Sequence, residues 1–151
     1  MEIPNLYARD TYGFDRLPTQ DQVLRCTKAF LIIAGSDGLT EEEFAYGLGI
    51  ARSFGLPEAQ ISELVNFDYR HTRLDEVLKD DIRPSARAFL YDAIRVASAD
   101  GAYSDTERTR LAAAADALGI DRRTRLSIEA LVATEDAHRK LRASLLFLSR
   151  N

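Results

Sequence analysis

Apolar residues recur at three- and four-residue spacing along most of the chain, which is the pattern of amphipathic helices. One stripe includes Val23, Phe30 and Ile33, and another includes Phe89 and Ala93. No segment shows the sustained alternation of apolar and polar residues that is typical of a half-buried strand. The pattern therefore predicts an all-α, single-domain helical bundle of about seven to eight helices.

Caps, prolines and glycines mark where these helices begin and end. We expect the first helix to begin near Thr19 or Asp21 and to end at Gly38. Later helices are predicted to open at a series of capping residues and first-turn prolines: Thr40, Pro57, Thr72, Pro84, Ser104, Asp121 and Thr134. In the last segment, Leu141, Leu145 and Leu148 form an apolar seam.

Residues 1–18 are predicted to form an aromatic N-terminal extension, and residues 19–151 to form the helical domain. The extension is too apolar for a free tail, because it contains Leu6, Tyr7, Tyr12, Phe14 and Leu17. We expect it to pack on the body of the protein or on a partner.

The chain contains an internal repeat. Each copy has a helix end, an Asp-Gly turn, an acidic capping box and a later helix-ending glycine: residues 34–38, 40–43 and Gly55 in the first copy, and residues 97–101, 104–107 and Gly119 in the second. The spacing from Glu43 to Gly55 equals that from Glu107 to Gly119. We interpret the copies as two helix–turn–helix halves of a pseudo-symmetric bundle.

Structural roles alone can account for the residues of these turns. Gly38 and Gly101 supply the left-handed conformation that ends a helix, and the preceding aspartates can accept bonds from backbone amides. Glu43 and Glu107 close capping boxes with Thr40 and Ser104.

A cation-binding role is the alternative. A carboxylate at the C-terminal end of a helix meets the negative end of the helix dipole, which a cation would relieve. If the pseudo-symmetry brings the two turns together, then Asp37, Glu43, Asp100 and Glu107 share one acidic surface. Oxygen ligands without Cys or His suit Ca²⁺ or Mg²⁺. The second turn has neutralising candidates in Arg95, Arg108 and Arg110.

The doubled Asp-Gly turn with its acidic capping box resembles the TerB-like tellurite-resistance family, over about residues 19–131. The resemblance implies a non-enzymatic, cytoplasmic helical module linked to tellurite resistance and stress response. It also implies acidic, metal-associated surfaces and protein partners. The residues that carry over are Asp37, Glu43, Asp100 and Glu107.

Charge limits the choice of partners. The net charge is -4, although residues 121–151 hold seven basic and four acidic side chains. An acidic body disfavours nucleic acid as a partner. The chain has no run of apolar residues long enough to cross a membrane and one cysteine, Cys26, which is compatible with the cytoplasm. The late basic residues could form a stripe for a partner or an anionic surface: Arg122, Arg123, Arg125, Arg139, Lys140 and Arg142.

Two other functions remain open. The chain could be a metal-free interaction adaptor or homodimeric scaffold that uses the aromatic extension and exposed helix faces. It could also be a small hydrolase that uses its carboxylates, which would require a closed pocket holding both Asp37 and Asp100. No nucleophile elbow, P-loop or dinucleotide motif occurs in the sequence.

Overall fold

The structure is a computed structural model, and it describes residues 2–13 and 16–147, except for the side chain of residue 81. All regular secondary structure in these residues is helical, which confirms the predicted all-α class. The elements in chain order are α1 (Ile3–Tyr12), α2 (Gln20–Ala34), η1 (Gly35–Asp37), α3 (Glu41–Ser53), α4 (Glu58–Val65), α5 (Leu74–Val77), η2 (Asp80–Ser85), α6 (Ala86–Ala97), α7 (Asp105–Ala117) and α8 (Arg122–Leu146).

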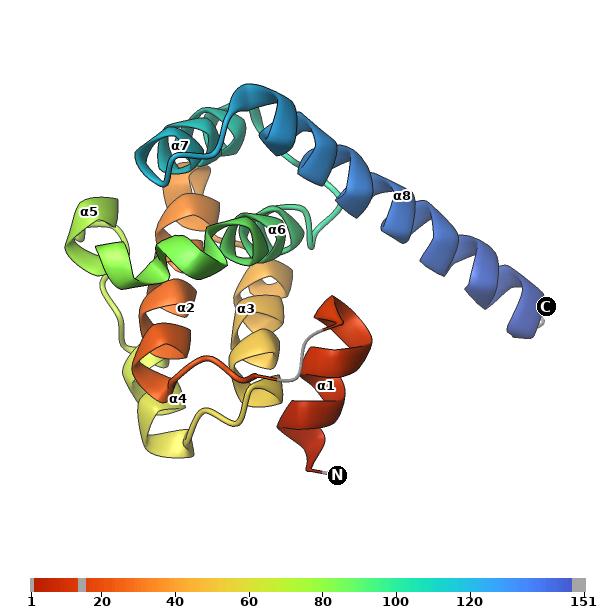
Figure 1. Cartoon of the computed structure of the whole chain (residues 1–151), viewed down its shortest axis with the longest axis horizontal. Helices are drawn as coiled ribbons and strands as arrows, with labels where there is room; N and C mark the ends of the chain where they lie inside the picture. The colour runs from red at the N-terminus through yellow and green to blue at the C-terminus, as the bar shows by residue number, and fades with distance from the viewer. Residues whose placement is uncertain (1, 14–15, 148–151) are drawn as a thin grey trace.

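Helices α2 and α6, the first helices of the two repeats, pack against each other at the centre of the molecule (Figure 1). Phe30 of α2 and Phe89 of α6 stack with their ring centroids 5.1 Å apart. Ile33, Leu90 and Leu111 have no exposed surface in this core. The apolar stripes of the sequence thus form the central contact between the repeats.

Most helix boundaries follow the predicted signals, with three differences. The helix that begins after Thr19 ends at Ala34, and a 3₁₀ turn covers the residues up to Asp37. Pro84 lies inside the 3₁₀ segment η2, so α6 begins two residues later. Thr134 caps no helix, because its hydroxyl donates to the Ala130 carbonyl at 2.8 Å within the single long helix α8.

Helix α1 lies beside α3 (Figure 1). Ala8 has no exposed surface, and the rings of Tyr7 and Tyr12 contact that of Phe54 with centroid distances of 5.2 and 5.6 Å. Aromatic packing therefore joins α1 to the end of α3. Phe14 and Leu148, which the sequence assigns to the extension and to the last seam, lie outside the described residues.

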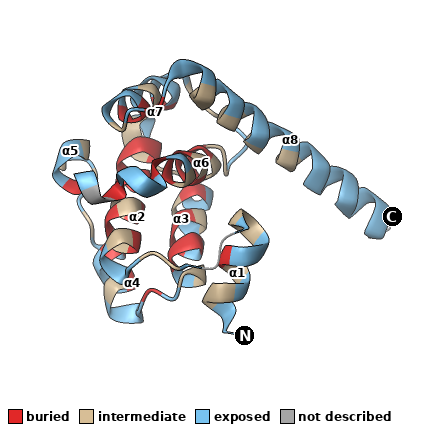
Figure 2. Ribbon diagram, in the orientation of Figure 1, coloured by how far each residue is buried: buried red, intermediate tan, exposed pale blue. Residues whose placement is uncertain are grey.

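Helix α8 packs against α6 and α7 near its start and then extends away from the body (Figure 1). Its far portion is exposed along its length (Figure 2). Within the described ranges, no helix combines the length and the apolar character needed to cross a membrane.

Candidate functional site

Both predicted capping boxes form. At the start of α3, the Glu43 amide donates to Thr40 Oγ1 at 3.2 Å, and the Thr40 amide donates to Glu43 Oε2 at 2.8 Å. At the start of α7, the corresponding distances between Ser104 and Glu107 are 3.1 and 2.9 Å. Each glutamate therefore turns back toward the turn that precedes its helix.

These two glutamates are buried. Glu43 is 1% exposed and Glu107 is 2% exposed. Removal of a carboxylate from water disfavours its charged form, and this desolvation is the main cause that raises the pKa of both residues. The pKa of Glu107 reaches about 7, although the bond from the Ser104 amide favours the ionised form. A buried carboxyl group that titrates near neutral pH is a candidate functional group.

The two repeats also influence each other electrostatically. The charges of Glu43 and Asp37 raise the pKa of Glu107, while the charges of Asp100 and Asp37 raise the pKa of Glu43. Asp37 ends η1, which lies against α7 of the other repeat. We call Asp37, Glu43, Asp100 and Glu107 the acidic cluster. Of the four residues predicted from the sequence, Glu43 therefore lies within electrostatic reach of the other three, and Glu107 within reach of Glu43 and Asp37.

The two aspartates occupy the exposed part of this cluster. Each precedes a glycine with a positive φ, 112° at Gly38 and 84° at Gly101. Asp100 Oδ1 accepts a bond of 2.8 Å from the Ala102 amide, so this carboxylate also supports its own turn. Structural and electrostatic roles therefore coincide in the same side chains.

Two arginines that could have neutralised the carboxylates of the second turn, Arg95 and Arg108, instead pair with other acidic residues. Arg95 Nη1 donates to Asp92 at 2.9 Å, and Arg108 lies 3.5 Å from Glu129. Over residues 2–13 and 16–147, no ion pair involves a member of the acidic cluster. No basic side chain of the described residues therefore neutralises the cluster through an ion pair.

The donor set suits a hard cation, but the side chains do not converge into a finished cage. In the described part of the chain, no three His, Cys, Asp or Glu side chains are grouped closely enough to hold a metal ion. One oxygen of Glu43 and one of Glu107 already accept backbone bonds. A cation here would be held by the remaining oxygens, by water, and by Asp37 and Asp100 after rotation of their exposed side chains.

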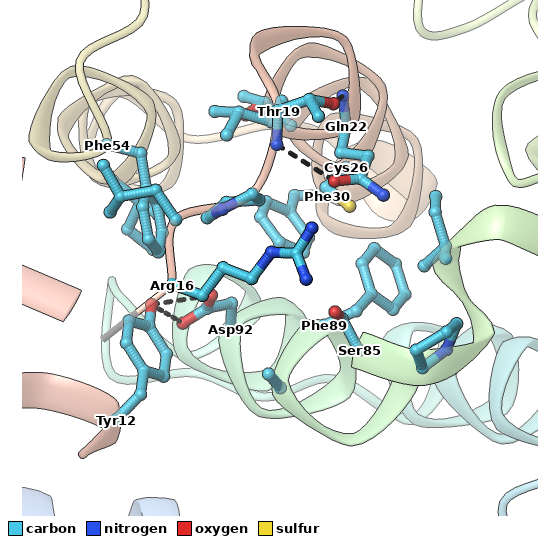
Figure 3. A pocket seen from close by; sticks show the side chains of 18 residues that line it. Tyr12, Arg16, Thr19, Gln22, Cys26, Phe30, Phe54, Ser85, Phe89 and Asp92 are labelled. Carbon is cyan, nitrogen blue, oxygen red and sulfur yellow. Dashed lines mark hydrogen bonds between the residues drawn. The ribbon is translucent and has the colours of Figure 1, made fainter. Parts of the chain in front are cut away.

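A second buried carboxylate lies away from the repeat turns. Asp92 is 6% exposed, and Tyr12 Oη lies 2.7 Å from both of its carboxylate oxygens, so this hydroxyl donates to the carboxylate (Figure 3). Burial raises the pKa of Asp92 to about 6, while Arg95 and Tyr12 act in the opposite direction. This contact joins residues 80 positions apart, and no local sequence signal indicates it.

A cavity of about 510 Å³ opens beside this pair, between α2, α6 and the segment that precedes α2. Its walls include Phe30, Phe54 and Phe89, and Arg16 reaches into it (Figure 3). No member of the acidic cluster lines it. The pocket that the hydrolase alternative requires, with Asp37 and Asp100 inside, is therefore not this cavity.

Comparison with known proteins points to the same family as the turns. No family model matches the sequence, and neither does any curated protein. A crystal structure of a tellurite resistance protein from Nostoc punctiforme, however, superposes with a TM-score of 0.84 at 27% identity. The match covers 99% of this chain and 94% of that protein. The chain has the TerB-like fold. The resemblance inferred from the doubled turn is thereby confirmed, and it extends to the N-terminal helix and α8 of the TerB-like chain.

Proposed function

We propose that this TerB-like protein is a non-enzymatic module of tellurite resistance and stress response whose acidic cluster binds Ca²⁺ or Mg²⁺ reversibly. One observation carries the proposal: the charge of Asp37 raises the pKa of both Glu43 and Glu107. The carboxylate in the turn of the first repeat therefore interacts electrostatically with the buried glutamates of both repeats. The relative that is named a tellurite resistance protein supports the cellular role.

The helix ends favour a cation at the outer side of this cluster. Asp37 and Asp100 follow the C-terminal ends of α2 and α6, where helix dipoles present their negative ends. Glu43 and Glu107 lie at the N-terminal ends of α3 and α7, which stabilise carboxylates. A cation near either aspartate would therefore meet an exposed carboxylate together with the negative end of a helix.

Protons and cations compete in this proposal. The pKa of Glu107 is about 7, so much of the Glu107 population carries a proton at neutral pH. A bound divalent cation favours the ionised carboxylate and releases that proton. Cation binding is therefore expected to strengthen as the pH rises from 6 to 8, a range that spans this pKa.

Isothermal titration calorimetry and thermal melts of metal-free protein with Ca²⁺ and with Mg²⁺ test the proposal. A cation at 100 times its Kd stabilises the folded state by about 2.7 kcal/mol. We expect a melting-temperature rise in wild type, its loss in Asp37→Asn, and its retention in the control Asp116→Asn, which changes an exposed carboxylate on α7. An equal rise in both variants, or no rise in wild type with either ion, would refute cation binding.

Protein partners and a cytoplasmic location complete the proposed role. The acidic cluster would be less negative with the cation bound than without it. The concentration of the cation would therefore control how strongly a protein partner binds to this surface. A tellurite-sensitivity assay in cells that lack the gene tests this role. Wild type should restore growth on tellurite, and Asp37→Asn should restore it less than Asp116→Asn does.

A further inference from the structure

The far portion of α8 exposes apolar side chains that nothing in the described chain covers. We call residues 137–146 the distal part of α8. Leu141 is 56% exposed, Leu145 72% and Leu146 67%. The distal part stands clear of the body in Figure 1 and is exposed throughout in Figure 2. Adjacent exposed leucines on an ordered helix mark a contact surface.

The same side of α8 forms one wall of a groove nearer to the body. This groove of about 610 Å³ lies between α1, α6 and α8, and Tyr12, Tyr91, Ile128, Leu131 and Glu135 are among its lining residues. At 100° per residue, Leu145 and Leu146 lie within about 60° of Leu131 around the helix axis. This side of α8 therefore carries Leu131 at the groove and Leu145 and Leu146 in the distal part, with the polar residues Glu135, His138 and Arg142 between them.

We propose that a second copy of this chain covers this face, with the two α8 helices packed antiparallel about a two-fold axis near His138 and Arg139. The distal part of each copy then lies in the groove of the other copy. Leu131 is opposite the partner's Leu145 and the partner's Leu146, and the contact repeats by symmetry. One surface thus supplies both the protruding helix and the groove that receives it.

Charge fixes the direction of the pair. Arg142 lies on the same side of α8 as Leu145 and Leu146, and Glu135 lies on the wall of the groove, where its Oε2 accepts a bond of 2.5 Å from Tyr91. In the antiparallel register, Glu135 is opposite the partner's Arg142, which makes two symmetric ion pairs. A parallel pair would instead place Arg142 next to the partner's Arg142. Arg123, another residue of the groove, is in the first turn of α8 and lies beyond the overlap.

An anionic membrane is the other surface that a basic, leucine-bearing helix could meet. The position of the face argues against it, because Leu145 and Leu146 share their side of α8 with Leu131 and Glu135, which line the groove. A flat lipid surface cannot enter a groove bounded by α1 and α6, whereas a second helix can.

Light scattering coupled to size exclusion, in EDTA and over a range of concentrations, tests the dimer. We expect wild type at twice the chain mass of 16.9 kDa, and Leu145→Glu at the single-chain mass. Arg142→Glu should also be monomeric, because it sets two carboxylates against each other, and Glu135→Arg with Arg142→Glu should restore the dimer. A loss of helix structure alone would not produce this rescue.

Cross-linking tests the register. In a Cys26→Ser background, His138→Cys lies near the proposed axis and should link to its partner with a short bismaleimide. The matched control Ala133→Cys, on the opposite side of α8, should not link. A wild-type monomer at every concentration, equal linking of both cysteines, or a monomer that binds phosphatidylserine vesicles through Leu145 would overturn the proposal. These measurements are made without divalent cations. Their outcome therefore tests the dimer independently of cation binding by the acidic cluster.

Discussion

Glu43 and Glu107 occupy the same position in the two repeats, and the charge of the first raises the pKa of the second. Each closes the capping box at the start of its own helix. The two glutamates therefore have two roles: each caps its own helix, and together they form a pair of buried carboxyl groups that interact electrostatically.

Glu107 should make the stability of the protein depend on pH. Its pKa rises from an ordinary value of 4.5 to about 7 in the folded state, so folding favours its protonated form. Stability from this group is fully present below pH 4.5 and is lost as the pH rises through 7. Glu107→Gln, which keeps an oxygen for the Ser104 amide, should flatten that decline in urea unfolding. A variant whose stability falls as steeply as wild type over this range would contradict the assignment.

The capping boxes should contribute measurable stability. Replacement of an N-cap Thr by Ala typically costs about 1 kcal/mol. We expect Thr40→Ala to lower the free energy of unfolding by that amount. Thr134→Ala is the matched control, because Thr134 lies in the interior of α8 and bonds a carbonyl of the same helix. An equal loss in both variants would show that Thr40 acts as an ordinary helix residue.

Tyr12→Phe should destabilise the contact between α1 and α6. The change removes the hydroxyl that contacts both oxygens of Asp92, and a buried carboxylate that loses a donor costs about 1–3 kcal/mol. The pKa of Asp92 should rise above about 6, because the Tyr12 bond lowers it. Chemical denaturation and carboxyl NMR measure the two effects. Tyr7→Phe is the control, since that hydroxyl lies 3.5 Å from Tyr12 Oη, and it should change stability less.

Signals that act over a few residues were readable from the sequence. The boxes at Thr40 and Ser104 and the glycines at the turns predicted both repeats, and the doubled pattern indicated the TerB-like fold that the superposition shows. The box between Thr19 and Gln22 has the same four-residue spacing, so its signal was available as well. Thr134 is not the helix cap that its position predicts, because a threonine hydroxyl inside a helix can donate to the carbonyl four residues earlier.

Contacts between distant segments could not be read in this way. The pair of Tyr12 and Asp92, and the cavity beside it, depend on how α1 and the segment before α2 lie on α6. Asp92 falls within an apolar helix stripe, where spacing alone does not tell a buried carboxylate from an exposed one. The electrostatic interactions within the acidic cluster likewise depend on the packing of η1 against α7. The repeat in the sequence suggests that the two turns meet, but it does not show this contact.

Carboxylates from both repeats form one electrostatic cluster, in which the charge of Glu43 raises the pKa of Glu107. Carboxyl ¹³C NMR titration of Glu107 in wild type and in Glu43→Gln measures this coupling directly. We expect a midpoint near 7 in wild type and a lower midpoint in Glu43→Gln, with no change in the control Glu58→Gln. The same Glu107 midpoint in wild type and Glu43→Gln would contradict it.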